Sequence, residues 1–120
     1  MKRYALAGAS SRGFSMYAVP ITETFKDYAK LVGIFDINRK RSEYISNRCG
    51  GIPVFDDFDK MLEETHPDYV IVTTIERYHH EYAIRAMNAG CDVIVEKPMT
   101  IDEEKCRAML ETEKRTGKKI

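Results

Sequence analysis

The chain has 120 residues, 43% of them hydrophobic, which is enough for one domain with an apolar core. Its 19 basic and 19 acidic residues give a formal net charge of zero, so bulk charge offers no argument for nucleic-acid binding. No apolar run approaches the roughly 20 residues of a membrane span. Three scattered cysteines without a C-x-x-C pair predict a cytoplasmic protein with reduced thiols and no metal site.

Strand and helix patterns alternate along the whole chain. The expected strands are short and apolar, and they span residues 3–7, 31–35, 54–55, 69–73 and 93–95. The expected helices end near residue 26 or cover about 39–48, 57–64, 79–88 and 102–115. Asp56 or Asp57 is expected to cap the third of these helices. This alternation predicts an α/β fold with one doubly wound parallel sheet in a single domain over residues 1–120. Lys118-Lys119-Ile120 resembles the start of a further strand, which suggests a truncated chain.

The loop after the first strand carries the first functional signal. Its sequence, Gly8-Ala9-Ser10-Ser11-Arg12-Gly13, is similar to the dinucleotide fingerprint G-x-G-x-x-G. Ser10 replaces the middle glycine, but serine is small and can donate its hydroxyl to a phosphate. We expect Gly13 to permit close packing between helix and strand, and the helix N-terminus to offer N–H groups to an anion. The alternative is a plain strand-to-helix turn.

Asp36 ends the second strand, about 20 residues after the glycine loop, where dinucleotide-binding domains place an acid for the ribose hydroxyls. The alternative is a helix-capping aspartate ahead of Arg39. The basic run Arg39-Lys40-Arg41 leaves two interpretations open, because an arginine there can neutralise the 2′-phosphate of NADP or belong to a solvated helix face. NAD is favoured as cofactor and NADP stays open.

Polar residues follow the last two strands. Thr73-Thr74 ends one, and Glu96-Lys97-Pro98 ends the other, so both segments are expected at the sheet edge where open α/β sheets bind ligands. Lys97 can supply a cation or a proton there. His79 lies near the next helix N-terminus and is expected to be neutral, either as a packing residue or as a substrate contact. An ordinary strand exit remains the alternative for the Lys97 segment.

With these loops in place, the chain resembles the Gfo/Idh/MocA family of NAD(P)-dependent oxidoreductases. Thr73-Thr74 followed by His79 is similar to the family's A-T-P-N-x-x-H-type segment. Residues 89–98, Ala-Gly-Cys-Asp-Val-Ile-Val-Glu-Lys-Pro, are similar to its A-G-x-x-V-x-x-E-K-P run. Ser10, Ile75 and Glu76 depart from the family pattern. The resemblance covers all 120 residues and implies an N-terminal NAD(P)-binding Rossmann domain whose C-terminal substrate domain is absent.

The resemblance implies hydride transfer between a nicotinamide and a hydroxyl-bearing carbon of a sugar, cyclitol or similar polyol. It assigns catalysis to Lys97 and His79, and a cis bond to Lys97-Pro98. The implied cofactor-binding residues are Gly8, Ser10, Ser11, Arg12, Gly13, Asp36, Arg39, Thr73, Thr74, Glu96 and Pro98. The isolated chain is expected to be inactive, and a homo-oligomer is left open. Two alternatives remain: a non-catalytic dinucleotide-binding sensor and an NAD-dependent glycosidase of the same family.

Overall fold

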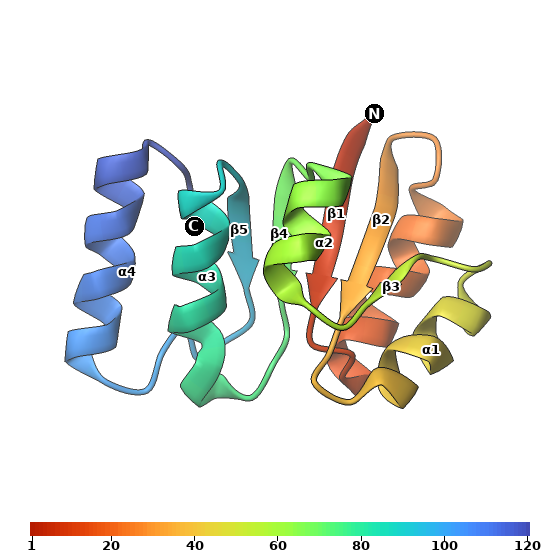
Figure 1. Cartoon of the computed structure of the whole chain (residues 1–120), viewed down its shortest axis with the longest axis horizontal. Coiled ribbons are helices and arrows are strands. Elements are labelled where there is room, and N and C mark those ends of the chain that lie inside the picture. The colour runs from red at the N-terminus through yellow and green to blue at the C-terminus, as the bar shows by residue number, and fades with distance from the viewer.

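Five parallel strands form the central sheet of this computed structural model, which describes residues 1–120 (Figure 1). They are β1 (Lys2–Ala7), β2 (Ala29–Phe35), β3 (Val54–Phe55), β4 (Tyr69–Val72) and β5 (Asp92–Val95). Their order across the sheet is β3-β2-β1-β4-β5, and every neighbouring pair is parallel. The chain therefore winds outward from β1 in one direction and then from β4 in the other. This confirms the predicted Rossmann-like single domain, and it puts the reversal of strand order between β1 and β4, where such sheets bind ligands.

Helices cover both faces of the sheet because the strands alternate their side chains between two apolar clusters. In β1, Ala5 and Ala7 belong to one cluster and Leu6 to the other. The first cluster is covered by α2 (Phe58–Thr65) and α3 (His79–Asn88), with α4 (Glu103–Thr116) packed beside α3 (Figure 1). The second is covered by η1 (Gly13–Ala18), η2 (Pro20–Thr24) and α1 (Arg39–Arg48). The result is three layers with the sheet buried in the middle.

The helix after the glycine loop is wider than an α-helix. The Val19 N–H donates to the Phe14 carbonyl and the Phe25 N–H to the Pro20 carbonyl, both five residues back in sequence. A π-type turn of this kind is rare and is often found at functional sites. Pro20 has no N–H and so interrupts the usual ladder of hydrogen bonds between the two wide segments. The helical stretch ends at Thr24, two residues before the predicted end.

Short polar side chains begin three of the helices. Asp57 caps α2 and Asp102 caps α4, each accepting a hydrogen bond from an N–H three residues later, at 2.9 and 2.8 Å. Asn38 caps α1, so the alternative interpretation of Asp36 as the cap of that helix is wrong. One short helix, η3 (Glu76–Tyr78), was not predicted; it leads directly into α3.

The last three residues lie beside β5. The Val93 N–H donates to the Lys119 carbonyl at 2.8 Å, and the Lys119 N–H donates to Asp92 Oδ1 at 2.9 Å. These three residues are not part of a β-strand. The interpretation of this segment as a truncated strand stays a prediction.

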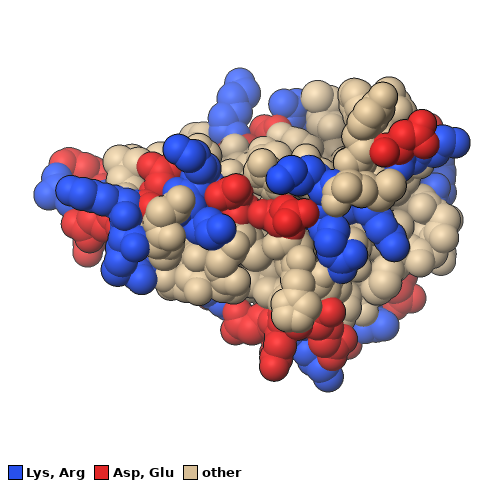
Figure 2. Space-filling view, turned by 90° about the horizontal axis from the view of Figure 1, so that it is seen from above, with Lys and Arg blue, Asp and Glu red and all other residues tan.

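The surface carries both signs of charge. On the face seen in Figure 2, which looks onto the amino ends of the strands, acidic and basic side chains are interspersed. No helix has the length and hydropathy needed to cross a membrane. No cluster of three or more histidine, cysteine or acidic side chains is arranged to hold a metal ion.

Candidate functional site

The glycine loop joins β1 to η1 and lies directly against the end of β4. Gly8 has φ +102°, and a Cβ at this position would lie 2.5 Å from the Thr74 nitrogen and 2.6 Å from the Thr73 carbonyl carbon. The Thr73 hydroxyl, which is buried, donates to the Gly8 carbonyl at 2.6 Å. The loop and the β4 exit are thus held together by backbone contacts that only glycine permits.

Gly13 brings η1 equally close to the sheet. A Cβ on Gly13 would lie 2.6 Å from Thr73 Oγ1, 2.8 Å from the Gly8 carbonyl oxygen and 3.4 Å from a Leu6 methyl group. This confirms the predicted close approach of helix and first strand. Ser10 Oγ accepts a hydrogen bond from the Gly13 N–H at 3.0 Å, so the serine caps the helix.

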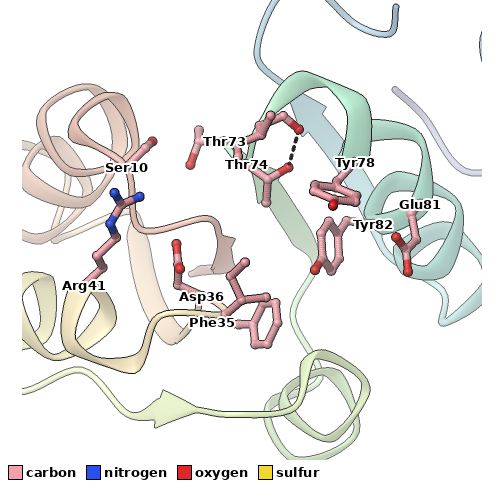
Figure 3. Close-up of a pocket in the computed structure, with 11 residues that line it drawn as sticks. Ser10, Phe35, Asp36, Arg41, Thr73, Thr74, Tyr78, Glu81 and Tyr82 are labelled. Atoms are coloured by element: carbon pink, nitrogen blue, oxygen red, sulfur yellow. Dashed lines mark hydrogen bonds between the residues drawn. The ribbon is translucent and has the colours of Figure 1, made fainter.

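Asp36 ties the end of β2 to the glycine loop. Its Oδ2 accepts the Ala9 N–H at 2.7 Å, and its Oδ1 accepts the Asn38 N–H at 2.7 Å. The side chain is half-buried and points toward the space beside Ser10 (Figure 3). Both carboxylate oxygens keep lone pairs for a further donor, because each oxygen of a carboxylate can accept more than one hydrogen bond.

A groove of ≈ 400 Å³ opens beside Asp36, over the boundary between β1 and β4 (Figure 3). One wall comes from Ile37 and Arg41 after β2, and the other from Ile75, Tyr78 and Tyr82 after β4. Ile37 and Ile75 are exposed. Burial, with the nearby Glu81 carboxylate, raises the pKa of the Tyr82 phenol, so this side chain is uncharged at neutral pH. The groove therefore combines aromatic and aliphatic walls with three charged side chains, those of Asp36, Arg41 and Glu81.

The two arginines of the basic run have different surroundings. Arg39 lies outside the groove, and its guanidinium is paired with Asp56 at 2.7 Å and Glu43 at 3.2 Å. Those carboxylates, Asp56 first, raise the Arg39 pKa. Arg41 lines the groove instead, and its guanidinium points toward Ser10 (Figure 3). The structure thus brings Arg41, and not the predicted Arg39, to the candidate site.

A second groove, of ≈ 360 Å³, continues from the first. The two grooves share Ser10, Thr73 and Thr74. The remaining lining residues of the second groove are all polar or charged, and they are Arg12, Glu76, His79, Glu96 and Lys97. The start of the helix lies at the junction, where the first-turn N–H groups of Ser11 and Arg12 have no carbonyl one turn earlier to bond.

Glu96 joins the Lys97 segment to the first helix. Its Oε1 accepts the Tyr17 hydroxyl at 2.8 Å and pairs with Arg12 Nε at 3.1 Å, while its Oε2 accepts the Lys97 N–H at 3.3 Å. The hydrogen bond from Tyr17 and the charge of Arg12 hold the pKa of Glu96 below its usual range. The Lys97-Pro98 peptide bond is cis, as expected, and the Lys97 side chain is exposed.

His79 lies in the wall of the second groove with only 1% of its surface exposed. Its Nδ1 is 2.9 Å from the Pro98 carbonyl oxygen, and its Nε2 is 2.9 Å from the Thr74 carbonyl oxygen. A neutral imidazole has one N–H and can donate to only one of these two carbonyls. The ring thus connects the two loops that carry Thr74 and Lys97.

Comparison with known protein families identifies the family of this chain. The model of an oxidoreductase family with an NAD-binding Rossmann fold matches residues 2–120. The chain belongs to the Gfo/Idh/MocA family. It is the NAD(P)-binding Rossmann domain of that family.

Individual members of the Gfo/Idh/MocA family resemble this chain over part of their own length. The chain is 32% identical to the putative oxidoreductase YteT of Bacillus subtilis, over 100% of this chain and 29% of the relative. It is 34% identical to the D-glucoside 3-dehydrogenase of Escherichia coli, over 74% of this chain and 25% of the relative. The crystal structure of the WlbA dehydrogenase from Chromobacterium violaceum, in complex with NADH and UDP-GlcNAcA, superposes with a TM-score of 0.90 at 27% identity. That match covers 99% of this chain and 34% of the other, so the chain spans about a third or less of these relatives.

The sequence patterns missed two parts of this Gfo/Idh/MocA domain. Tyr17 was not a candidate, because its partner Glu96 is 79 residues away in sequence and nothing local marks the pair. The aromatic wall of Tyr78 and Tyr82 was also missed. Its four-residue spacing at the start of α3 was a usable signal, because such residues share a helix face.

Proposed function

We propose that the full-length protein to which this domain belongs is an NAD(P)-dependent oxidoreductase. It exchanges hydride between the nicotinamide and a hydroxyl-bearing carbon of a sugar, cyclitol or similar polyol. Related dehydrogenases, including the D-glucoside 3-dehydrogenase of Escherichia coli, support this substrate class. The hydride chemistry is the cofactor's own, and the domain supplies binding and orientation.

The observation that carries the proposal is the continuity of the two grooves. Asp36 lines only the first groove, Lys97 lines only the second, and Ser10, at the helix N-terminus, lines both. A dinucleotide needs the same sequence of surroundings: an acceptor for ribose hydroxyls, N–H donors for the pyrophosphate, and an open polar end for nicotinamide and substrate. The residues present therefore fit the cofactor that the family implies.

Lys97 is the residue of this domain best placed to act on substrate. Its side chain is exposed in the second groove, and an ammonium group there can orient a substrate hydroxyl and assist proton movement at that oxygen. His79 is assigned a positioning role instead of direct contact, because it is buried and has a backbone carbonyl at each ring nitrogen. It holds the Thr74 and Pro98 loops at a fixed separation.

NAD is the favoured cofactor. Asp36 offers an anion where the 2′-position of the adenosine ribose is expected, and a carboxylate there repels a 2′-phosphate. Arg41 works in the opposite direction, since it lines the same groove and no carboxylate lies within ion-pair distance of it. We therefore expect tighter binding of NAD with measurable binding of NADP.

Calorimetric titration of the 120-residue chain with NAD tests the proposal directly. We expect a dissociation constant of about millimolar or tighter. Asp36→Ala should weaken binding by about tenfold, which corresponds to one charged hydrogen bond. Asp56→Ala is the matched control, because Asp56 is exposed and pairs with Arg39 outside the groove. Absence of both NAD and NADP binding, by calorimetry and by saturation-transfer NMR, contradicts the proposal.

Activity of the full-length protein separates the proposal from its alternatives. A dehydrogenase loses turnover on polyols in the Lys97→Ala variant. A regulatory sensor binds NAD, oxidises no polyol and is unaffected by that change. A glycosidase of this family copurifies with its cofactor and releases sugar from a glycoside.

Two further inferences accompany the proposed function. We place the protein in the cytoplasm, with support from its three free cysteines, of which Cys91 is buried and donates its thiol hydrogen to the Pro67 carbonyl. Burial raises the pKa of that thiol and keeps it protonated. A homo-oligomer is compatible with the full-length protein, and its mass in solution is measured by light scattering.

A further inference from the structure

One carboxylate connects the helix that follows the glycine loop to the segment that carries Lys97. Glu96 follows β5, while Arg12 and Tyr17 belong to the helix that follows β1. β1 and β5 are not neighbours, because β4 lies between them in the sheet. The contact therefore crosses the carboxyl end of β4 beside the second groove, which both Arg12 and Glu96 line.

The wide turn of η1 explains how both side chains reach the same carboxylate. Residues five apart in an α-helix point in directions about 140° apart, since each residue turns the helix by about 100°. A turn closed by hydrogen bonds to the fifth residue back contains more residues than an α-helical turn, so residues five apart come to lie on nearly the same side of the helix. Arg12 and Tyr17 have this spacing, and η1 has this type of turn. The irregular helix thus aligns an arginine and a tyrosine on Glu96 Oε1.

The charges of the three groups suit a stable contact at neutral pH. The pKa of Glu96 is lowered, first by the Tyr17 hydroxyl and then by Arg12, so the carboxylate is ionised. Burial and the hydrogen bond to Glu96 raise the pKa of Tyr17, so the phenol keeps the proton that it donates. The Glu96 side chain is 15% exposed, whereas that of Arg12 is 53% exposed. Tyr17 therefore makes the shielded part of the contact and Arg12 the solvent-accessible part.

We propose that Tyr17 and Arg12 are positioning residues that act on Lys97 through Glu96. The other oxygen of Glu96 accepts the Lys97 N–H, so the backbone of Lys97 is fixed relative to the first helix. The same helix offers its N-terminus at the groove junction. Binding of a dinucleotide at that N-terminus is then coupled to the placement of Lys97. This inference rests on the proposed function, adds Tyr17 to its site and gives Arg12 a positioning role there.

The test uses NMR of the 120-residue chain, with labelled lysine backbone amides and side chains, labelled glutamate carboxyl groups, and NADH as the added ligand. Tyr17→Phe removes one hydroxyl and little else. Tyr44→Phe is the matched control, because the Tyr44 hydroxyl accepts a hydrogen bond from Arg48 on α1 and has no contact with Glu96. Circular dichroism of each variant verifies that the fold is retained.

We expect three results. In Tyr17→Phe, the pKa of Glu96 rises toward its ordinary value and the Lys97 amide resonance shifts, even without NADH. The change in the Lys97 side-chain signal on addition of NADH becomes smaller. NADH affinity stays within about threefold of wild type, because Tyr17 lies outside the groove linings. Tyr44→Phe reproduces the wild-type values in all of these measurements.

Two outcomes overturn the inference. In the first, Lys97 responds to NADH equally in wild type and in Tyr17→Phe. In the second, Arg12→Ala lowers NADH affinity but leaves the Lys97 response intact, which makes Arg12 a direct cofactor ligand. A chain that binds no NADH at all refutes the proposed function instead, and the Glu96 pKa and Lys97 amide measured without ligand still report on the contact itself.

Discussion

Replacing Gly8 by alanine tests the packing that holds the glycine loop against the β4 exit. The new Cβ would lie 2.5 Å from the Thr74 nitrogen, 2.6 Å from the Thr73 carbonyl carbon and 2.8 Å from its oxygen. All three are backbone atoms of a segment that is itself fixed by sheet hydrogen bonds, so no side chain can rotate away. The loop or the end of β4 must move.

Two costs add in this variant. An L-residue at the positive φ of Gly8 costs about 1–2 kcal/mol. Overpacking against an ordered backbone costs about 1–3 kcal/mol more. We therefore expect the free energy of unfolding to fall by about 2–5 kcal/mol, a large share of the roughly 5–15 kcal/mol typical of a domain. Circular dichroism during urea denaturation measures this difference.

Gly90→Ala is the control that separates the two costs. Gly90 also has a positive φ, +91° against +102° for Gly8, but a Cβ there would meet nothing within 4 Å. We expect Gly90→Ala to lose only the conformational cost, about 1–2 kcal/mol. If both variants lose the same free energy of unfolding, the close approach of Gly8 to Thr73 and Thr74 adds no cost to the substitution. That result refutes the overpacking argument.

Three further predictions concern the remaining parts of the site. Arg39→Ala should leave NAD affinity unchanged, whereas Arg41→Ala should alter binding of NADP more than of NAD; parallel calorimetric titrations decide this. Thr73→Val keeps the side-chain shape but leaves the Gly8 carbonyl without its buried donor, and urea denaturation should show a loss of about 1–3 kcal/mol. Because the folded-state pKa of Glu96 is depressed, its contribution to stability is present above the unfolded-state pKa and is lost as pH falls through the lower folded-state value. Urea denaturation at a series of pH values below about 4.5 measures this loss. The free energy of unfolding should decline less steeply with falling pH in Glu96→Gln than in wild type.

The order of strands and helices could be predicted because it depends on local patterns. The apolar run of β4 and the capping side chains of Asp57 and Asp102 need no knowledge of distant residues. The carboxyl-edge location of Asp36 and Lys97 followed from the parallel topology alone. Short-range sequence and chain direction are sufficient to predict these features.

To predict which of Arg39 and Arg41 faces the groove, one must know how α1 is rotated about its own axis. Ile45 is buried against the sheet, and Arg41 lies one helical turn before it, on the same side of the helix. Arg39 pairs instead with Glu43, one turn later on another side. The burial of Ile45 was not used in the sequence interpretation, although an apolar residue in a polar helix usually marks the face turned toward the core.

The wide turn of η1 could not be predicted from periodicity, because periodicity assumes a constant rotation per residue. Under that assumption Arg12 and Tyr17 lie on different sides of the helix, and no common partner is expected. Their shared contact with Glu96 appears only when the turn is widened and the ends of β1 and β5 are brought to one edge.

The difference in polarity between the two grooves argues for one direction of the dinucleotide. Aromatic and aliphatic side chains wall the groove beside Asp36, and such surfaces suit the faces of an adenine ring. The groove that Lys97 lines has only polar and charged lining, which suits a hydroxylated substrate better than an adenine ring. A cofactor bound in the reverse sense would put its adenine among Arg12, Glu96 and Lys97 and leave the aromatic wall uncovered. We therefore expect the adenosine beside Asp36 and the reacting end beside Lys97.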